Sequence, residues 1–206
     1  MRLLGYEVIR FITCGLKLFS YRFIGKGGLR VLPLSIAFFS IMFGIMSCDE
    51  MTKVYSNREL VRCNFIVSSY TELFSVMGNY GQFASIRNMG NGKVRMTVAS
   101  TGKYTDYQQD KIQSYFYYGL GGLILGTNYN GEVLCYDLSC PHCDAVAYRL
   151  NMKDNGFAKC PRCGVTYDLN NYGVISSIDS TKTYANLRGL YRYHIVFDGT
   201  TVNMYN

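Results

Sequence analysis

Histidine and proline are scarce in this chain. Its 206 residues include only two histidines, His142 and His194. Neither stands in a recognised catalytic arrangement with a nucleophile and a carboxylate, so the sequence does not indicate hydrolase chemistry. His194 has no ligand partner near it in the sequence, and we expect it to be an ordinary strand residue.

Most of the basic excess of the chain lies in its first 47 residues. The formal net charge is +7, but residues 1–47 hold six Lys or Arg and one Glu, whereas the later residues hold 15 Lys or Arg and 13 Asp or Glu. A nearly neutral surface lacks the basic stripe that phosphate neutralisation needs, so we expect no nucleic-acid partner. The glycine-rich stretch 119–122 has no following helix and no lysine, which predicts a turn and no nucleotide site.

The N-terminal region is similar to a bacterial lipoprotein signal peptide. Residues 31–47 form an uncharged, mostly apolar run that follows three basic residues and ends at Cys48. This layout predicts a leader over 1–47, lipidation at Cys48, and a linker over 48–63. A plain transmembrane anchor is the alternative, although 17 apolar residues are at the short limit for crossing a bilayer. Either way, we expect a domain in the bacterial cell envelope, with the membrane as partner through its anchor.

From residue 64 onward the chain alternates short apolar and polar runs between glycines, which is typical of strands and hairpins. Turns are predicted at 128–131 and at 198–199, where Asn and Gly tolerate positive φ. The fold class we expect is therefore all-β, an antiparallel sandwich. The expected strands are 65–68, 82–87, 94–99, 123–127, 132–137, 166–168, 173–176, 190–197 and 201–205.

Two C-x-x-C pairs, separated by 16 residues, are the strongest chemical signal in the sequence. We name them the first knuckle, with Cys140 and Cys143, and the second knuckle, with Cys160 and Cys163. Each pair favours a tight loop whose two sulfurs point the same way, and two facing loops make a tetrahedron of thiolates. Such a site suits zinc or a single iron.

Two of the three prolines stand at the second position of a knuckle, as Pro141 and Pro161. Their fixed φ holds each knuckle bent before a metal arrives, which lowers the ordering cost of binding. Gly164, directly after the second knuckle, allows the backbone to turn so that amides face the thiolates.

The knuckle region resembles the Rieske iron-sulfur domain. That family's pattern is C-x-H, a gap of similar length, and C-x-x-H-G, followed by an aromatic residue, an aspartate and a glycine. The resemblance covers 64–206 and implies a Rieske-like β-sandwich with a small metal-binding insert at about 138–172, a [2Fe–2S] type of iron-sulfur cluster, and electron transfer with a redox partner protein. The matching residues are Cys140, His142, Cys160, Cys163, Gly164, Tyr167, Asp168 and Gly173.

The sequence departs from the Rieske pattern at one ligand, because Cys163 stands in place of the second histidine. A cluster here would be ligated by Cys140, Cys160, Cys163 and either Cys143 or His142. Greater thiolate ligation predicts a lower potential than that of a two-histidine centre. Four cysteines are complete without His142, which favours a His142 side chain that points outward.

Three other functions fit parts of the pattern. The first knuckle matches the active-site tetrapeptide of periplasmic thiol oxidases, in which Cys140 and Cys143 would exchange disulfides, but the long helix that should follow is not predicted. In an oxidising compartment the cysteines could instead form disulfides, including one between Cys63 and Cys135. Zinc or disulfides could also brace a non-catalytic interaction module. The leading hypothesis is a metal-centred electron-transfer or redox role in a binding domain, with no stand-alone enzyme predicted.

Overall fold

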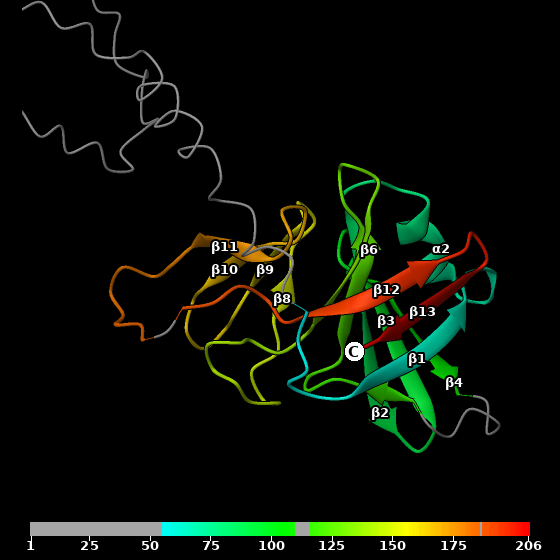
Figure 1. Ribbon diagram of the computed structural model, residues 1–206, viewed down its shortest axis with the longest axis horizontal. Helices are drawn as coiled ribbons and strands as arrows, with labels where there is room; N and C mark the ends of the chain where they lie inside the picture. The colour runs from blue at the N-terminus through cyan, green and yellow to red at the C-terminus, as the bar shows by residue number, and fades with distance from the viewer. Residues whose placement is uncertain (1–54, 110–115, 186) are drawn as a thin grey trace, which may run out of the picture. The chain divides into compact units, whose positions relative to one another are not determined.

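The computed structural model describes residues 55–109, 116–185 and 187–206 (Figure 1). The expected leader 1–47, Cys48 and the first part of the expected linker lie outside these residues. No helix among the described residues is long and apolar enough to cross a membrane.

Thirteen strands form two sheets in the described residues, which confirms the all-β, sandwich-like fold class. The larger sheet has nine strands in the order β4-β3-β2-β6-β7-β12-β13-β1-β5, and every pair is antiparallel. Its strands are β1 (Val61–Ile66), β2 (Gln82–Gly90), β3 (Lys93–Val98), β4 (Tyr104–Gln108), β5 (Tyr117–Tyr118), β6 (Leu123–Thr127), β7 (Val133–Asp137), β12 (Arg192–Phe197) and β13 (Thr201–Tyr205).

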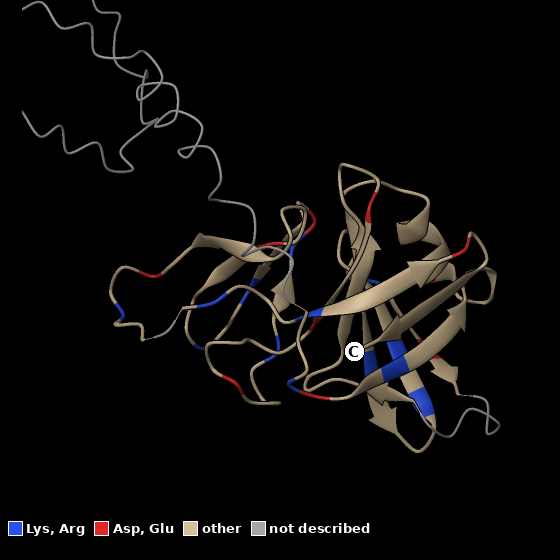
Figure 2. Cartoon of the chain, viewed as in Figure 1, with Lys and Arg blue, Asp and Glu red and all other residues tan. Residues whose placement is uncertain are grey.

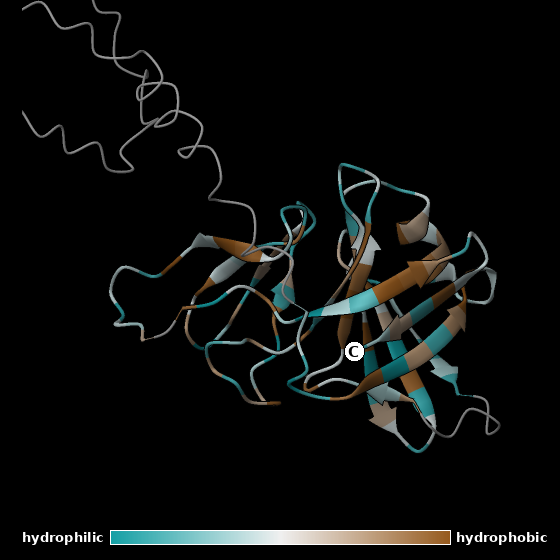
Figure 3. Ribbon diagram, viewed as in Figure 1, coloured by the Kyte–Doolittle hydropathy of each residue, from teal (hydrophilic) through white to brown (hydrophobic). Residues whose placement is uncertain are grey.

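Strand β6 is buried on both faces because it lies between two hydrophobic cores. Leu123 and Leu125 point into the first core, which the larger sheet encloses, and Ile124 points into the second. Side chains alternate between the faces of a strand, so a continuous apolar sequence is what such a position requires. Figure 3 shows the largely hydrophobic colour of β6.

The smaller sheet carries the second knuckle and packs on the second core. Its order is β11-β10-β9-β8, again antiparallel throughout. The second core joins Phe83 and Leu134 of the larger sheet to Ala158 and Tyr167 of the smaller one. The strands are β8 (Asn151–Met152), β9 (Phe157–Lys159), β10 (Thr166–Asp168) and β11 (Val174–Ser177), so this sheet continues beyond the insert expected at 138–172.

Both predicted hairpin turns are present. Gly131 donates its amide to the carbonyl of Asn128, and Asp198 donates to the carbonyl of Thr201. Gly199 has a φ of +90°, which a residue without Cβ adopts at little cost. The first turn joins β6 to β7, the strand that leads to the first knuckle, and the second turn joins β12 to β13.

The start of the domain differs from the expectation. Strand β1 begins at Val61, inside the expected linker, and ends at Ile66, where the sequence predicted a strand over 65–68. A 3-10 turn (Val67–Ser69) and a short helix, α2 (Thr71–Met77), follow it. Glu72 of this helix is buried, and its carboxylate accepts hydrogen bonds from Thr105 and Tyr107.

Candidate metal centre

The first knuckle begins three residues after β7 and is closed by backbone hydrogen bonds. The amide of Cys140 donates to the carbonyl of Tyr148, and the amide of Asp144 donates back to the carbonyl of Cys140. A bridge between Ser139 and Arg149 holds the two ends of the loop together. These contacts therefore fix both ends of the loop without a metal ion.

The second knuckle connects β9 to β10 in the smaller sheet. The amide of Cys160 donates to the carbonyl of Val165 over 2.9 Å, and the amide of Gly164 donates to the carbonyl of Cys160 over 3.0 Å. Gly164 has a φ of +82°, a conformation that side-chain-bearing residues rarely adopt. The expected turn under the sulfurs is thus present, and glycine makes it possible.

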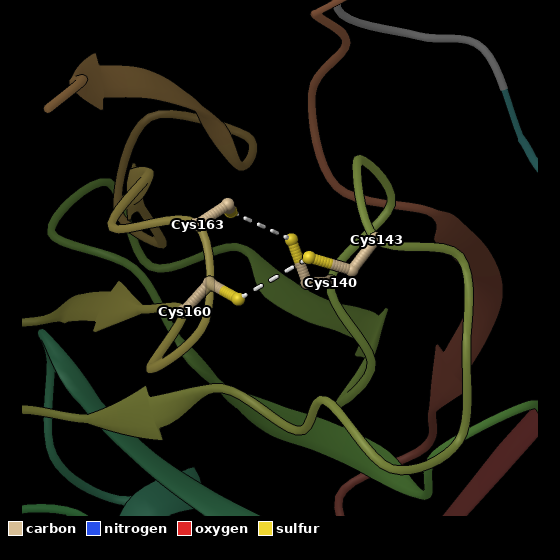
Figure 4. Close-up of side chains that lie close together, drawn as sticks. All are labelled: Cys140, Cys143, Cys160 and Cys163. Atoms are coloured by element: carbon tan, nitrogen blue, oxygen red, sulfur yellow. Dashed lines mark hydrogen bonds between the residues drawn. The ribbon is translucent and has the colours of Figure 1, made fainter. Parts of the chain in front are cut away.

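The two knuckles face each other, and their four sulfurs converge. The Sγ atoms all lie within 4.8 Å of one another. Figure 4 shows the side chains of the first knuckle pointing toward those of the second, with Cys140 opposite Cys163 at 3.6 Å and Cys143 opposite Cys160 at 3.7 Å. These four cysteines form a group that could hold a metal ion.

Burial separates the four sulfurs into an inner set and an outer one. Cys140 and Cys160 are fully buried and Cys163 nearly so, and all three belong to the second hydrophobic core. Cys143 is only partly buried. A group held here would therefore be shielded from water on most sides and approachable at Cys143.

Asp137, the last residue of β7, anchors the start of the first knuckle. Its buried carboxylate accepts hydrogen bonds from the amide and hydroxyl of Ser139 and from the hydroxyl of Tyr193. It also accepts from the amides of Leu120 and Gly121, in the predicted turn at 119–122. One carboxylate thus ties together the turn before β6, the first knuckle and β12.

Two tyrosine hydroxyls contact cysteines of the group, one at a sulfur and one at the backbone. The hydroxyl of Tyr167, in β10, lies 3.5 Å from Cys140 Sγ. Burial, and then the contact with Cys140, raise the pKa of Tyr167, so the phenol keeps its proton as a donor. The hydroxyl of Tyr184 donates to the backbone carbonyl of Cys163 over 2.7 Å, which ties the loop after β11 to the second knuckle.

The thiols of the group differ in acidity. Burial raises the pKa of Cys143 to about 11, and Cys140 and Cys160 add to the effect. Burial likewise raises the pKa of Cys163. At Cys160 burial acts upward too, but hydrogen bonds from the backbone amides of Cys163 and Arg162 outweigh it and leave the pKa below its ordinary value. The thiolate, which is the form that binds a metal, is therefore better stabilised at Cys160 than at Cys143 or Cys163.

The structure brings Cys143, and not His142, together with the other three cysteines. The His142 ring packs at a tilt against the ring of Tyr184, with centroids 5.2 Å apart. His194 lies on β12 and stacks between Tyr55 and Tyr205, as an ordinary strand residue can.

The remaining cysteines of the described residues lie outside the group. Cys63 in β1 and Cys135 in β7 both contribute to the first core, and both are free thiols, so the disulfide considered between them is absent from the structure. Cys48, the expected lipidation site, lies outside the described residues.

Several supporting residues could not be recognised from the sequence alone. The sequence predicts Asp137 only as the last residue of a strand, and it indicates Tyr167 only through the Rieske-like resemblance. A further contact joins Arg58 to Asp144, whose carboxylate also accepts a hydrogen bond from Tyr191. The available signal for Asp137 was an acidic residue at the end of an apolar strand, a few positions before a knuckle.

No family model, no curated protein and no solved structure matches this chain. The fold and the site therefore define the class of protein by themselves. In its described residues it is an all-β protein, with antiparallel sheets of nine and four strands and a largely buried four-cysteine group that could hold a metal ion.

Proposed function

We propose that this domain binds a single metal ion through Cys140, Cys143, Cys160 and Cys163, and that with iron the centre carries one electron at the bacterial cell envelope. The observation that carries the proposal is the sulfur geometry. Metal–sulfur bonds of about 2.3 Å in a regular tetrahedron separate the sulfurs by about 3.8 Å. Two sulfur pairs across the knuckles, at 3.6 and 3.7 Å, agree with such a tetrahedron.

The same distances favour one ion over an iron-sulfur cluster. In a two-iron cluster each iron takes its own pair of protein ligands, and bridging sulfides lie between the irons. The two ligand pairs must then stand on opposite sides of a larger core than one ion makes. Four sulfurs that all lie within 4.8 Å of one another leave little room for that core. The proposal therefore retains the two-loop layout and the fold that the Rieske-like resemblance implies, and it replaces the cluster with a single ion.

An iron held by four thiolates can cycle between the ferric and ferrous states by gaining and losing one electron. No bond needs to form or break, so the protein contributes by holding the cage rigid in both states. The backbone bonds of the knuckles, the Asp137 carboxylate and the Tyr167 hydroxyl supply that rigidity. The partial exposure of Cys143 offers a redox partner protein a short path to the centre.

The cell-envelope location rests on the sequence of the N-terminal region. A charged flank, an apolar run and Cys48 support export and a lipid anchor. Metabolic labelling with palmitate should mark the wild-type chain and not the Cys48→Ala variant. Equal labelling of both would remove the lipid anchor from the proposal.

A structural zinc site is the second candidate, and the burial of the group favours it. Three of the four cysteines are part of the second hydrophobic core, and four thiolates leave no position open for a substrate. Zinc would then brace the smaller sheet against the larger one in a non-catalytic interaction module.

Two other readings of the cysteines fit the structure less well. A thiol oxidase needs an accessible nucleophile, whereas Cys140 is fully buried and is followed by turns with no long helix. Disulfide sulfurs lie about 2.05 Å apart, well below the 3.6 and 3.7 Å between the knuckles.

The decisive experiment is metal analysis and visible absorption of the full chain purified without oxygen. We expect one iron per chain, with thiolate-to-iron absorption that bleaches on reduction and returns on oxidation. A colourless chain with one zinc would assign the structural role, and a chain that binds neither metal would contradict both. Cys160→Ser should lose the metal, whereas Cys63→Ala, a buried cysteine outside the group, should keep it.

A further inference from the structure

A small basic pocket lies beside the second knuckle. Its volume is about 240 Å³. Since a water molecule takes about 30 Å³ of liquid volume, this space admits a tetrahedral oxyanion with part of its hydration shell. The residues that line it with polar side chains are Asn151, Lys153, Lys159, Asp179 and Lys182, and Cys160 also lines it.

The β8–β9 hairpin places three of these donors on one face. Asn151 and Lys159 are directly opposite each other in the register of the two strands. Lys153 follows Asn151 by two residues, and its amide pairs with the carbonyl of Phe157. Because residues two apart share a face of a strand, the Asn151 amide and both ammonium groups belong to the same side. Figure 2 shows lysine and arginine segments on the strands and loops of this sheet.

The positive charge of the pocket is only partly neutralised by the protein. Lys182 donates to the carbonyl of Arg162 over 2.8 Å and lies 3.6 Å from the Asp179 carboxylate. That carboxylate also accepts hydrogen bonds from the amide and hydroxyl of Thr181. In the described part of the chain, no carboxylate is within salt-bridge distance of Lys153 or Lys159, so two ammonium groups face the pocket without a counter-ion.

We propose that this pocket binds a small tetrahedral oxyanion, held by Lys153, Lys159 and the Asn151 amide. Ammonium groups form their strongest hydrogen bonds with charged oxygens, and phosphate offers several such oxygens at once. The site goes beyond the proposed function, because its donors come from side chains that do not bind the metal. Cys160, one of the four cysteines of the metal group, also lines the pocket, so the bound anion lies beside the second knuckle.

A simpler role for the lysines is to offset the charge of the metal centre. Four thiolates around a divalent ion leave a net negative charge, and nearby cations reduce its cost. That role requires no anion in the pocket. The two roles differ in their response to added phosphate, and this difference is what the experiment measures.

The test is calorimetric titration of the full chain with inorganic phosphate, and then with sulfate, at constant ionic strength in chloride. We expect saturable binding of one anion per chain. Lys153→Gln and Lys159→Gln should each weaken it about tenfold, because each removes one charge-assisted hydrogen bond. Asp179→Asn should tighten it, since the Asp179 carboxylate is removed from the pocket wall. The matched control is Lys103→Gln, an exposed lysine in the turn between β3 and β4.

A soluble headgroup, glycerophosphoglycerol, distinguishes the source of the oxyanion. Binding of inorganic phosphate assigns the pocket to a free ion, and binding of the headgroup alone assigns it to a lipid phosphate. The proposal would be overturned if neither phosphate nor the headgroup binds, or if the three pocket variants, Lys153→Gln, Lys159→Gln and Asp179→Asn, bind the anion as the wild type does. If Lys159→Gln changes the metal affinity but the wild type binds no anion, the proposal is overturned, and the lysines only offset the charge of the metal centre. Measuring the metal content of each sample in parallel distinguishes a failure of anion binding from a failure of metal binding.

Discussion

The hydroxyl of Tyr167 lies 3.5 Å from Cys140 Sγ, and both groups are buried. The two residues come from different structural units, since Tyr167 is in β10 of the smaller sheet and Cys140 follows β7 of the larger one. A metal-bound thiolate has no proton, so in a loaded centre the phenol is the donor. Hydrogen bonds to ligating sulfur stabilise the more electron-rich state of a metal–thiolate centre.

Replacing Tyr167 with Phe should therefore lower the reduction potential of an iron-loaded centre. Loss of a hydrogen bond worth about 1 kcal/mol corresponds to a decrease of about 40 mV for a one-electron couple. Redox titration followed by visible absorption measures the change. Tyr136→Phe is the matched control, because it removes a buried tyrosine hydroxyl that donates to the carbonyl of Leu169 and to none of the sulfurs. Equal reduction potentials for the wild type and Tyr167→Phe would show that this hydroxyl does not affect the potential of the centre.

Asp137→Asn should destabilise the domain by about 3 kcal/mol, whatever the metal content. The carboxylate is fully buried and accepts from five donors, whereas an asparagine amide turns one acceptor into a donor that faces other donors. Denaturant unfolding measures the loss. Asp106→Asn removes an exposed carboxylate that pairs with Arg95, and it should change the unfolding free energy little. If both variants unfold alike, the Asp137 network is not a main support of the fold.

Much of the larger sheet could be predicted from the sequence, because its strands show their burial in the residue pattern. Alternation marks β13, where Val202 and Met204 are buried and their neighbours are not. A continuous apolar run marks β6 between its two cores. The fold class and the two hairpin turns follow from such local signals, and the knuckles follow from the spacing of the cysteines.

The sequence does not predict several short or exposed strands, because they form through pairing with a neighbouring strand and show no clear pattern in their own residues. Strand β4 is mostly exposed and polar, and it exists because it pairs with β3. Strands β8 and β9 have two and three residues, too few for a periodic signal. The role of Asp137 depends on the turn at 119–122, which only the tertiary fold brings close to the Asp137 carboxylate. Choosing between His142 and Cys143 likewise needed the orientation of the side chains.

The two core cysteines should remain unmodified in the native protein. Burial raises the pKa of Cys63 and of Cys135, and the thiolate is the form that alkylating reagents attack. Iodoacetamide at pH 8, followed by mass spectrometry, should leave both residues unlabelled in the folded chain and label both after unfolding without a reductant. Failure to label them in the unfolded chain would mean that a disulfide joins them, which would contradict the free thiols of the structure.

Removing the side chain of His142 should leave metal binding intact, whereas removing the sulfur of Cys143 should not. Cys143 Sγ lies 3.7 Å from Cys160 Sγ inside the group, and the His142 ring packs against Tyr184 instead. His142→Ala should keep one metal per chain with an unchanged absorption spectrum, and Cys143→Ser should lower metal affinity by at least tenfold, because a hydroxyl is a poor substitute for a thiolate. Metal analysis after dialysis against a competing chelator measures both. The reverse pattern, with metal lost from His142→Ala and kept by Cys143→Ser, would restore the mixed ligand set that the Rieske-like resemblance allows and remove the four-sulfur tetrahedron on which the single-ion proposal depends.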